Sequence, residues 1–195
     1  GVRGMALKGD DEVISLSILR RSGADQDERE AYMRAAPWKS NDNAPALSEE
    51  RMAEMAEREQ FILTVCANGY GKRSSAYEYR RTGRGGQGIT NIDNIARNGA
   101  VVASFAARDG EQLMLITNQA KMIRLEIGGM RVIGRNTAGV KLFDVADNEH
   151  IVSSAKIGET DDEDDGVEGE GIDSAIASVD AAPVEGAVAA PDSED

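Results

Sequence analysis

One relation within the sequence constrains the fold of this 195-residue chain more than any other: a repeat with a period of 51 residues. Residues 1–19 read as the end of a further copy, because Val13 lies as far beyond Gly1 as Ile151 lies beyond Gly139. A period near fifty is typical of propeller-like arrays, so we expect consecutive β blades. The matched positions are Arg73 with Arg124, Arg80 with Arg131, Gly83 and Arg84 with Gly134 and Arg135, and Gly88 with Gly139.

Within each copy, short apolar runs rich in branched residues alternate with turn signals. The runs at residues 61–65, 101–105 and 113–117 have the length and composition of strands. Paired turn residues separate these runs, as at Asn68 and Gly69 or at Asp109 and Gly110. We therefore predict an all-β fold of β-pinwheel (propeller-like) blades with roughly four strands in each unit.

The repeat is interrupted before residue 61 by a segment with helical signals. Asp25 and Glu28 form a capping-box pattern that opens a helix, and this helix must end before Pro37. Ser48 is placed to cap a second helix with two glutamates in its first turn. We expect residues 20–60 to be a helical insertion that packs on the side of a blade.

The formal net charge of −13 is distributed unevenly along the chain. Residues 158–195 contain fourteen acids and no Lys or Arg, whereas residues 61–157 contain thirteen bases and eight acids. The acidic segment lacks aromatic residues and has the composition of a disordered tail. The predicted organisation is an end of one blade at 1–19, the insertion at 20–60, blades at 61–110 and 111–157, and the disordered tail at 158–195.

Composition also restricts the location and the chemistry. The sequence has no apolar run near eighteen residues and no secretory signal pattern, so we expect neither a membrane span nor export. The single Cys66 excludes an internal disulfide framework and is typical of the cytoplasm. The single His150 has no second His or Cys partner, so no metal site is predicted. The chain begins at Gly1 without a Met, which suggests a piece of a longer polypeptide.

The most distinctive local feature is a glycine-rich basic segment. Residues 69–90 hold six glycines, five basic side chains and one acid. Residues 83–88 match the G-x-G-x-x-G pattern of dinucleotide sites, but poor helix formers follow them, so we reject that interpretation. Glycines bring backbone N–H groups close to phosphates, and repeated arginines on successive blades would make a curved track for duplex DNA. The candidate DNA-binding residues are Lys72, Arg73, Arg80, Arg81, Arg84, Lys121, Arg124, Arg131 and Arg135; we assign no catalytic residue.

Three stretches, NGYGKRSSAYEYRRTGRGGQGI at 68–89, VIGRNTAGVKLF at 132–143 and GVRGM at 1–5, resemble the last blades of the C-terminal β-pinwheel in the DNA gyrase A subunit family. The resemblance implies a basic rim that wraps and bends DNA for an ATP-hydrolysing type IIA DNA topoisomerase, an isomerase that introduces negative supercoils. ATP and Mg²⁺ would be bound elsewhere in the enzyme. The gyrase B subunit and a second A subunit would join through a missing N-terminal part, as an A2B2 heterotetramer. Residues 82–88 resemble a degenerate copy of the family's Q-R-R-G-G-K-G box that retains Arg84, Gly85, Gly86 and Gly88.

Alternative interpretations remain open at this stage. The A subunit of topoisomerase IV has a similar pinwheel, and a propeller-type scaffold could bind an acidic protein partner instead of DNA. RNA binding through the single Arg-Gly-Gly triplet at residues 84–86 ranks last. In the DNA-binding interpretation, we expect the acidic tail to compete with DNA for the basic rim.

Overall fold

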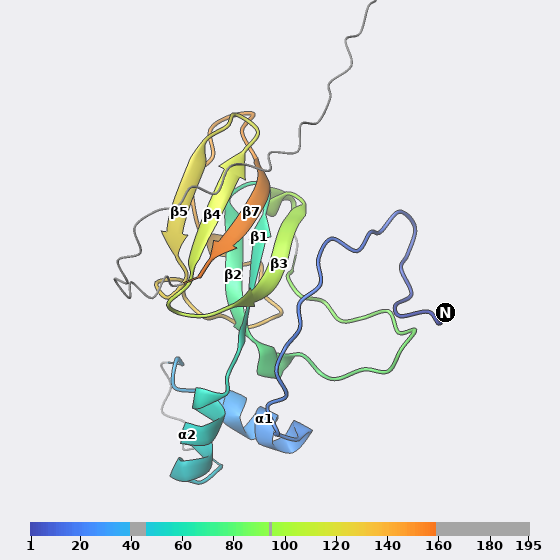
Figure 1. Ribbon diagram of the computed structural model, residues 1–195, viewed down its shortest axis with the longest axis vertical. Coiled ribbons are helices and arrows are strands. Elements are labelled where there is room, and N and C mark those ends of the chain that lie inside the picture. Colours follow the sequence, from blue (N-terminus) through green and yellow to red (C-terminus); the bar gives the residue numbers. More distant parts are fainter. Residues whose placement is uncertain (40–45, 94, 159–195) are drawn as a thin grey trace, which may run out of the picture. The chain divides into compact units, whose positions relative to one another are not determined.

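The computed structural model describes residues 1–39, 46–93 and 95–158 of the chain (Figure 1). These residues lie within one compact unit, Gly1–Thr160. The predicted disordered tail lies outside the described residues, apart from Gly158.

Two antiparallel sheets carry the repeat. In each sheet a central strand pairs with two neighbours, β1 with β2 and β3, and β4 with β5 and β7. The registers agree with the 51-residue offset, since Phe61 pairs with Ser75 as Gln112 pairs with Glu126. A register irregularity even falls at equivalent places, after Val65 and after Ile116. The strands are β1 (Phe61–Cys66), β2 (Tyr70–Ser75), β3 (Val101–Ala107), β4 (Gln112–Thr117), β5 (Met122–Glu126) and β7 (Ile151–Ile157).

A short strand, β6 (Val140–Lys141), belongs to the second repeat copy by sequence but pairs within the first sheet. It pairs with β2 through Tyr70 and Gly71, so the first sheet has the order β3-β1-β2-β6 and the second has the order β5-β4-β7. The sequence did not predict this pairing, because a repeat offset identifies equivalent strands and does not identify their partners.

The two sheets share a hydrophobic core. Leu63 and Val65 of β1 pack in one cluster with Leu113 and Leu115 of β4, and all four side chains are fully buried. The inward side chains alternate along β4, as expected for a strand with one face in the core. This shared core couples the two repeat units.

The insertion contains two helices, as predicted. Helix α1 (Gln26–Arg34) begins with the capping box of Asp25 and Glu28, and α2 (Glu49–Glu57) begins at the N-cap Ser48. Neither helix has the length and apolar character needed to cross a bilayer, and no other helix among the described residues does.

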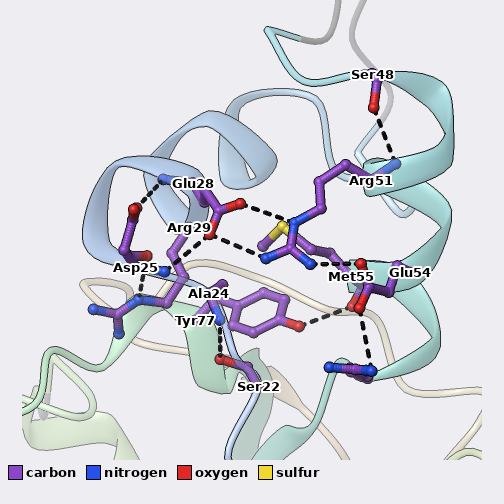
Figure 2. Close-up of polar contacts among 11 residues, drawn as sticks. Ser22, Ala24, Asp25, Glu28, Arg29, Ser48, Arg51, Glu54, Met55 and Tyr77 are labelled. Carbon is purple, nitrogen blue, oxygen red and sulfur yellow. Dashed lines mark hydrogen bonds and ion pairs between the residues drawn. The ribbon is translucent and has the colours of Figure 1, made fainter.

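The insertion packs on the first repeat unit through a second, smaller core. Tyr32 of α1 and Met55 of α2 pack around Tyr77, which lies in the short 3-10 helix η1 (Ala76–Glu78) directly after β2. The Tyr32 and Tyr77 rings meet edge to face with their centroids 5.2 Å apart. The hydroxyl of Tyr77 also donates a hydrogen bond to the backbone carbonyl of Met55 (Figure 2). The insertion therefore packs against η1, which lies within the glycine-rich segment.

The N-terminal residues form no strand of their own. Residues 11–20 are exposed, and the hydroxyl of Ser15 donates to the carbonyl oxygen of Ser104 in β3. The hydroxyl of Ser17 accepts from the backbone N–H of Ala106 in the same strand. This segment thus runs beside β3 with side-chain contacts in place of a backbone ladder.

Candidate nucleic-acid interface

The last part of the glycine-rich segment forms an exposed loop after η1, which we call the open loop (residues 80–88). All nine of its residues are exposed. Gly85 and Gly88 have φ angles of +76° and +80°, a backbone conformation that favours glycine. The loop curves around a shallow hollow that Arg80, Arg81 and Arg84 help to line. Among the described residues, these three guanidinium groups have no hydrogen-bond or ion-pair partner.

Backbone hydrogen bonds hold the open loop to the start of the chain. The N–H of Gly85 donates to the carbonyl of Gly4, and the N–H of Ala6 donates to the carbonyl of Gly86, both at 2.9 Å. These bonds hold the loop backbone and do not engage its arginine side chains.

The equivalent segment in the second copy, which we call the docked loop (residues 131–139), is held against β2. The ammonium group of Lys72 donates to the carbonyl oxygens of Gly134 at 3.0 Å and Thr137 at 3.2 Å, and also to that of Arg135. The backbone N–H of Arg135 donates to a carboxylate oxygen of Glu78 at 2.5 Å. The docked loop is therefore part of the packed structure.

Lys72 and Arg73 are buried, with exposed fractions of 1% and 6%. Burial lowers the pKa of Lys72 to about 8. The Arg73 guanidinium pairs with Asp109 and lies 4.8 Å from the centre of the Phe61 ring. Lys72 and Arg73 were predicted to bind DNA, but in this structure both side chains are buried and make their contacts inside the chain.

Arg135 and Arg131 differ within the docked loop. Arg135 is half-buried, and its guanidinium donates to the carbonyl oxygen of Thr90. Arg131 is exposed and, within the described part of the chain, has no partner. Arg131 is thus exposed like Arg80, its equivalent in the repeat. Arg135 differs from its equivalent Arg84, because its guanidinium is half-buried and hydrogen-bonded to Thr90.

Lys121 and Arg124 are exposed but already have partners. Lys121 pairs at 2.7 Å with Glu149, whose side chain is buried. This ion pair, with hydrogen bonds from the N–H of Ala146 and the hydroxyl of Thr117, lowers the pKa of Glu149 to about 2. Arg124 donates to the side-chain oxygen of Gln112. Within the described residues, the four predicted site residues whose guanidinium groups have no partner are Arg80, Arg81, Arg84 and Arg131.

Three further arginines that the sequence interpretation missed lie near Arg81. Arg20, Arg21 and Arg29 line a cleft beside the insertion, together with Arg81. The adjacent Arg20 and Arg21 were a visible signal in the sequence, but nothing in the repeat placed them beside the open loop.

The remaining candidates for other chemistry have ordinary surroundings. No helix follows the G-x-G-x-x-G pattern at residues 83–88 directly; the next helical turn in the described chain is η2 (Ala96–Asn98), a three-residue 3-10 helix. Burial raises the pKa of the Cys66 thiol, which disfavours a reactive thiolate. A dinucleotide site at the open loop therefore has no support in its geometry.

Comparisons with known proteins identify the family and agree with the fold. The family model of the DNA gyrase C-terminal domain, a β-propeller, matches residues 1–20, 60–108 and 111–157. The A subunit of DNA gyrase from Granulibacter bethesdensis is 44% identical over 188 residues, covering 85% of this chain and 20% of the relative. The corresponding gyrase protein of Rickettsia bellii is 43% identical over 176 residues, covering 85% of this chain and 19% of the relative.

A solved structure of a DNA gyrase A C-terminal domain aligns with a TM-score of 0.47 and 26% identity, over 50% of this chain and 33% of that chain. The chain spans about a fifth of the length of the curated relatives that it matches. The family match covers the strands of both sheets and confirms the predicted all-β, propeller-like fold class. This chain belongs to the family of the DNA gyrase C-terminal domain.

Proposed function

We propose that this chain is the C-terminal DNA-wrapping part of a gyrase A subunit, which binds and bends duplex DNA. The observation that carries this proposal is the open loop, where Arg80, Arg81 and Arg84 are exposed and have no partner within the described residues. Free guanidinium groups on a loop with a fixed backbone are suited to bind phosphates, because their donors need not first leave another partner.

The repeat explains how a duplex would be bent. Arg80 and Arg131 occupy equivalent positions 51 residues apart, and both are exposed. Phosphate contacts at equivalent points on successive blades draw the duplex along a curved surface, and the contacts offset the cost of bending. Such binding depends on backbone charge and has little sequence preference.

In the whole protein, this part would serve an ATP-dependent type IIA DNA topoisomerase in the cytoplasm. The catalytic residues and the sites for ATP and Mg²⁺ would lie outside this chain, and so would the contacts with a B subunit and a second A subunit in an A2B2 assembly. The gyrase interpretation is favoured over topoisomerase IV because the relatives with 43–44% identity are A subunits of DNA gyrase.

The test uses the full-length protein that contains this chain and a random-sequence duplex. Arg80→Gln with Arg84→Gln removes two free guanidinium groups from the open loop. Each lost phosphate contact should reduce the slope of log affinity against log salt concentration by about 0.9. The matched control, Arg34→Gln with Arg108→Gln, removes the same charge from exposed sites outside the open loop.

We expect the open-loop variant to lose about 1 to 2 from this slope and to bend the duplex less in an end-to-end fluorescence transfer measurement. The control should retain both properties. An open-loop variant with the slope and bending of the wild type would contradict the proposal. Wild-type protein that binds an acidic protein but no duplex DNA would favour the scaffold alternative.

A further inference from the structure

A basic cleft lies where the insertion meets the first repeat unit. One wall comes from residues 19–25 and Arg29, and the other comes from Gln60, Ala76, Tyr77, Tyr79 and Arg81. The cleft has a volume of about 670 Å³ and is partly open to solvent. Four of its lining residues are arginines, Arg20, Arg21, Arg29 and Arg81, and one is an acid, Asp25.

Within the cleft, the arginines have N–H donors that could bind a ligand, whereas the Asp25 carboxylate is already hydrogen-bonded inside the chain. The carboxylate of Asp25 accepts from the backbone N–H of Glu28 at 2.9 Å as the N-cap of α1. Arg29 is held by hydrogen bonds to the carbonyl oxygens of Asp25 and Tyr79, at 3.1 and 3.2 Å, which leaves further N–H donors on its guanidinium group. The side chains of Arg20 and Arg21 are exposed and have no partner among the described residues.

Three acids of the insertion are engaged by contacts within the insertion. Glu28 and Glu54 both pair with Arg51, and Figure 2 shows both carboxylates beside the Arg51 guanidinium. Glu59 accepts hydrogen bonds from the hydroxyl of Tyr32 and the indole N–H of Trp38 in the small core. Although residues 20–60 carry seven bases and ten acids, the cleft itself is positive.

The cleft and the hollow of the open loop share one lining residue. Arg81 lines both. Arg20 and Arg21 in the cleft and Arg80 and Arg84 in the hollow are therefore linked through Arg81, and none of these five side chains has a partner among the described residues. We propose that the cleft binds the phosphate backbone of duplex DNA, so that the insertion extends the DNA path that begins at the open loop. This proposal rests on the function proposed above.

An extended polyanion fits the cleft better than a small anion does. A small anion is retained by donors that converge on one enclosed point, whereas these arginines line two open hollows that share Arg81. Contacts spread along a path each neutralise one phosphate and release counterions independently. The insertion would thereby lengthen the bound segment of DNA without adding sequence preference.

The test compares three variants of the full-length protein on a random-sequence duplex. Arg20→Gln with Arg21→Gln alters the cleft at two exposed side chains whose loss leaves the small core intact. Arg80→Gln with Arg84→Gln alters the open loop, and Arg34→Gln with Arg108→Gln is the charge-matched control. The readouts are the salt slope of duplex affinity, the length of hydroxyl-radical protection on the duplex, and the binding of inorganic phosphate and free nucleotide. Thermal unfolding checks that each variant is folded.

We expect the cleft variant to lose about 1 to 2 from the salt slope and to protect a shorter stretch of duplex, with the control unchanged. If the open-loop variant is impaired and the cleft variant is not, the cleft proposal is wrong and the proposed function stands. If neither variant differs from the wild type, both proposals fail. A cleft variant that loses phosphate or nucleotide binding while its duplex binding is unchanged would identify a small-anion site and overturn the proposal.

Discussion

The open loop and the docked loop occupy the same place in a 51-residue repeat, yet they have opposite surroundings. The open loop is exposed throughout, and its backbone hydrogen bonds to the rest of the described chain run to Gly4 and Ala6. The docked loop lies against β2, where Lys72 donates to its carbonyl oxygens. The repeat therefore determines strand register, whereas contacts with the adjacent unit determine which copy of the loop is exposed.

The largest expected difference between the two loops is in the loss of stability caused by a Gly→Ala substitution. Gly88 and Gly139 are equivalent in the repeat and have φ angles of +80° and +81°. A Cβ at Gly139 would lie 2.6 Å from the carbonyl oxygen of Gly71, whereas a Cβ at Gly88 would meet nothing within 4 Å. We expect Gly139→Ala to lower the free energy of unfolding by about 3 kcal/mol and Gly88→Ala by about 1 kcal/mol. Urea unfolding measures both, and equal losses would contradict the distinction between the loops.

Removal of the Lys72 ammonium should release the docked loop. Lys72→Met retains most of the apolar stem but removes a charged donor from three carbonyl oxygens, at a cost of about 2 kcal/mol. The carbonyls of Gly134 and Thr137 keep hydrogen bonds from the Thr137 hydroxyl and the Asp93 N–H. Amide hydrogen exchange should accelerate across residues 133–139 and remain unchanged in the open loop. Lys141→Met, at an exposed lysine paired with Asp144, is the matched control and should change stability by less than about 0.5 kcal/mol. Unchanged exchange in the docked loop would show that Lys72 does not hold it.

The titration of Lys72 should also make stability depend on pH, with a smaller effect than its substitution has. Burial lowers the folded-state pKa of Lys72 from 10.5 to about 8, so between these values the unfolded chain holds a proton that the folded chain has released. The contribution of Lys72 to stability should therefore rise as pH increases from about 8 to about 10.5. The difference in unfolding free energy between wild type and Lys72→Met should widen over that interval, because all other groups titrate in both proteins. If the difference in unfolding free energy between wild type and Lys72→Met narrows or stays constant, the pKa of Lys72 is not lowered in the folded chain.

Much of the fold was predictable because its signals are local or periodic. The capping box at Asp25 lies within one helical turn, and α1 begins there. The 51-residue offset gave the equivalence of β1 with β4 and of β2 with β5. The pairing of β6 with β2 was not predictable in this way, because that contact depends on how one unit packs against the other.

The candidate site was predictable in its residue types and only partly in its exposure. Arg80 and Arg84 are exposed as expected, whereas Lys72 and Arg73 are buried although they belong to the same basic segment. Outward and inward positions in β2 could not be separated, because both of its faces are covered by the fold. Arg20 and Arg21 were missed because only tertiary packing brings them beside Arg81.

The distinction between the two loops depends most directly on a difference in DNA contact between Arg84 and Arg135. The deciding measurement is the salt slope of duplex affinity for Arg84→Gln and Arg135→Gln, made separately in the full-length protein. Arg84 is exposed without a partner in the described chain, whereas the Arg135 guanidinium donates to the carbonyl of Thr90. We predict that Arg84→Gln reduces the slope by about 0.9, the value of one phosphate contact, and that Arg135→Gln leaves it unchanged. Equal reductions in both variants, or a reduction in Arg135→Gln alone, would contradict the account.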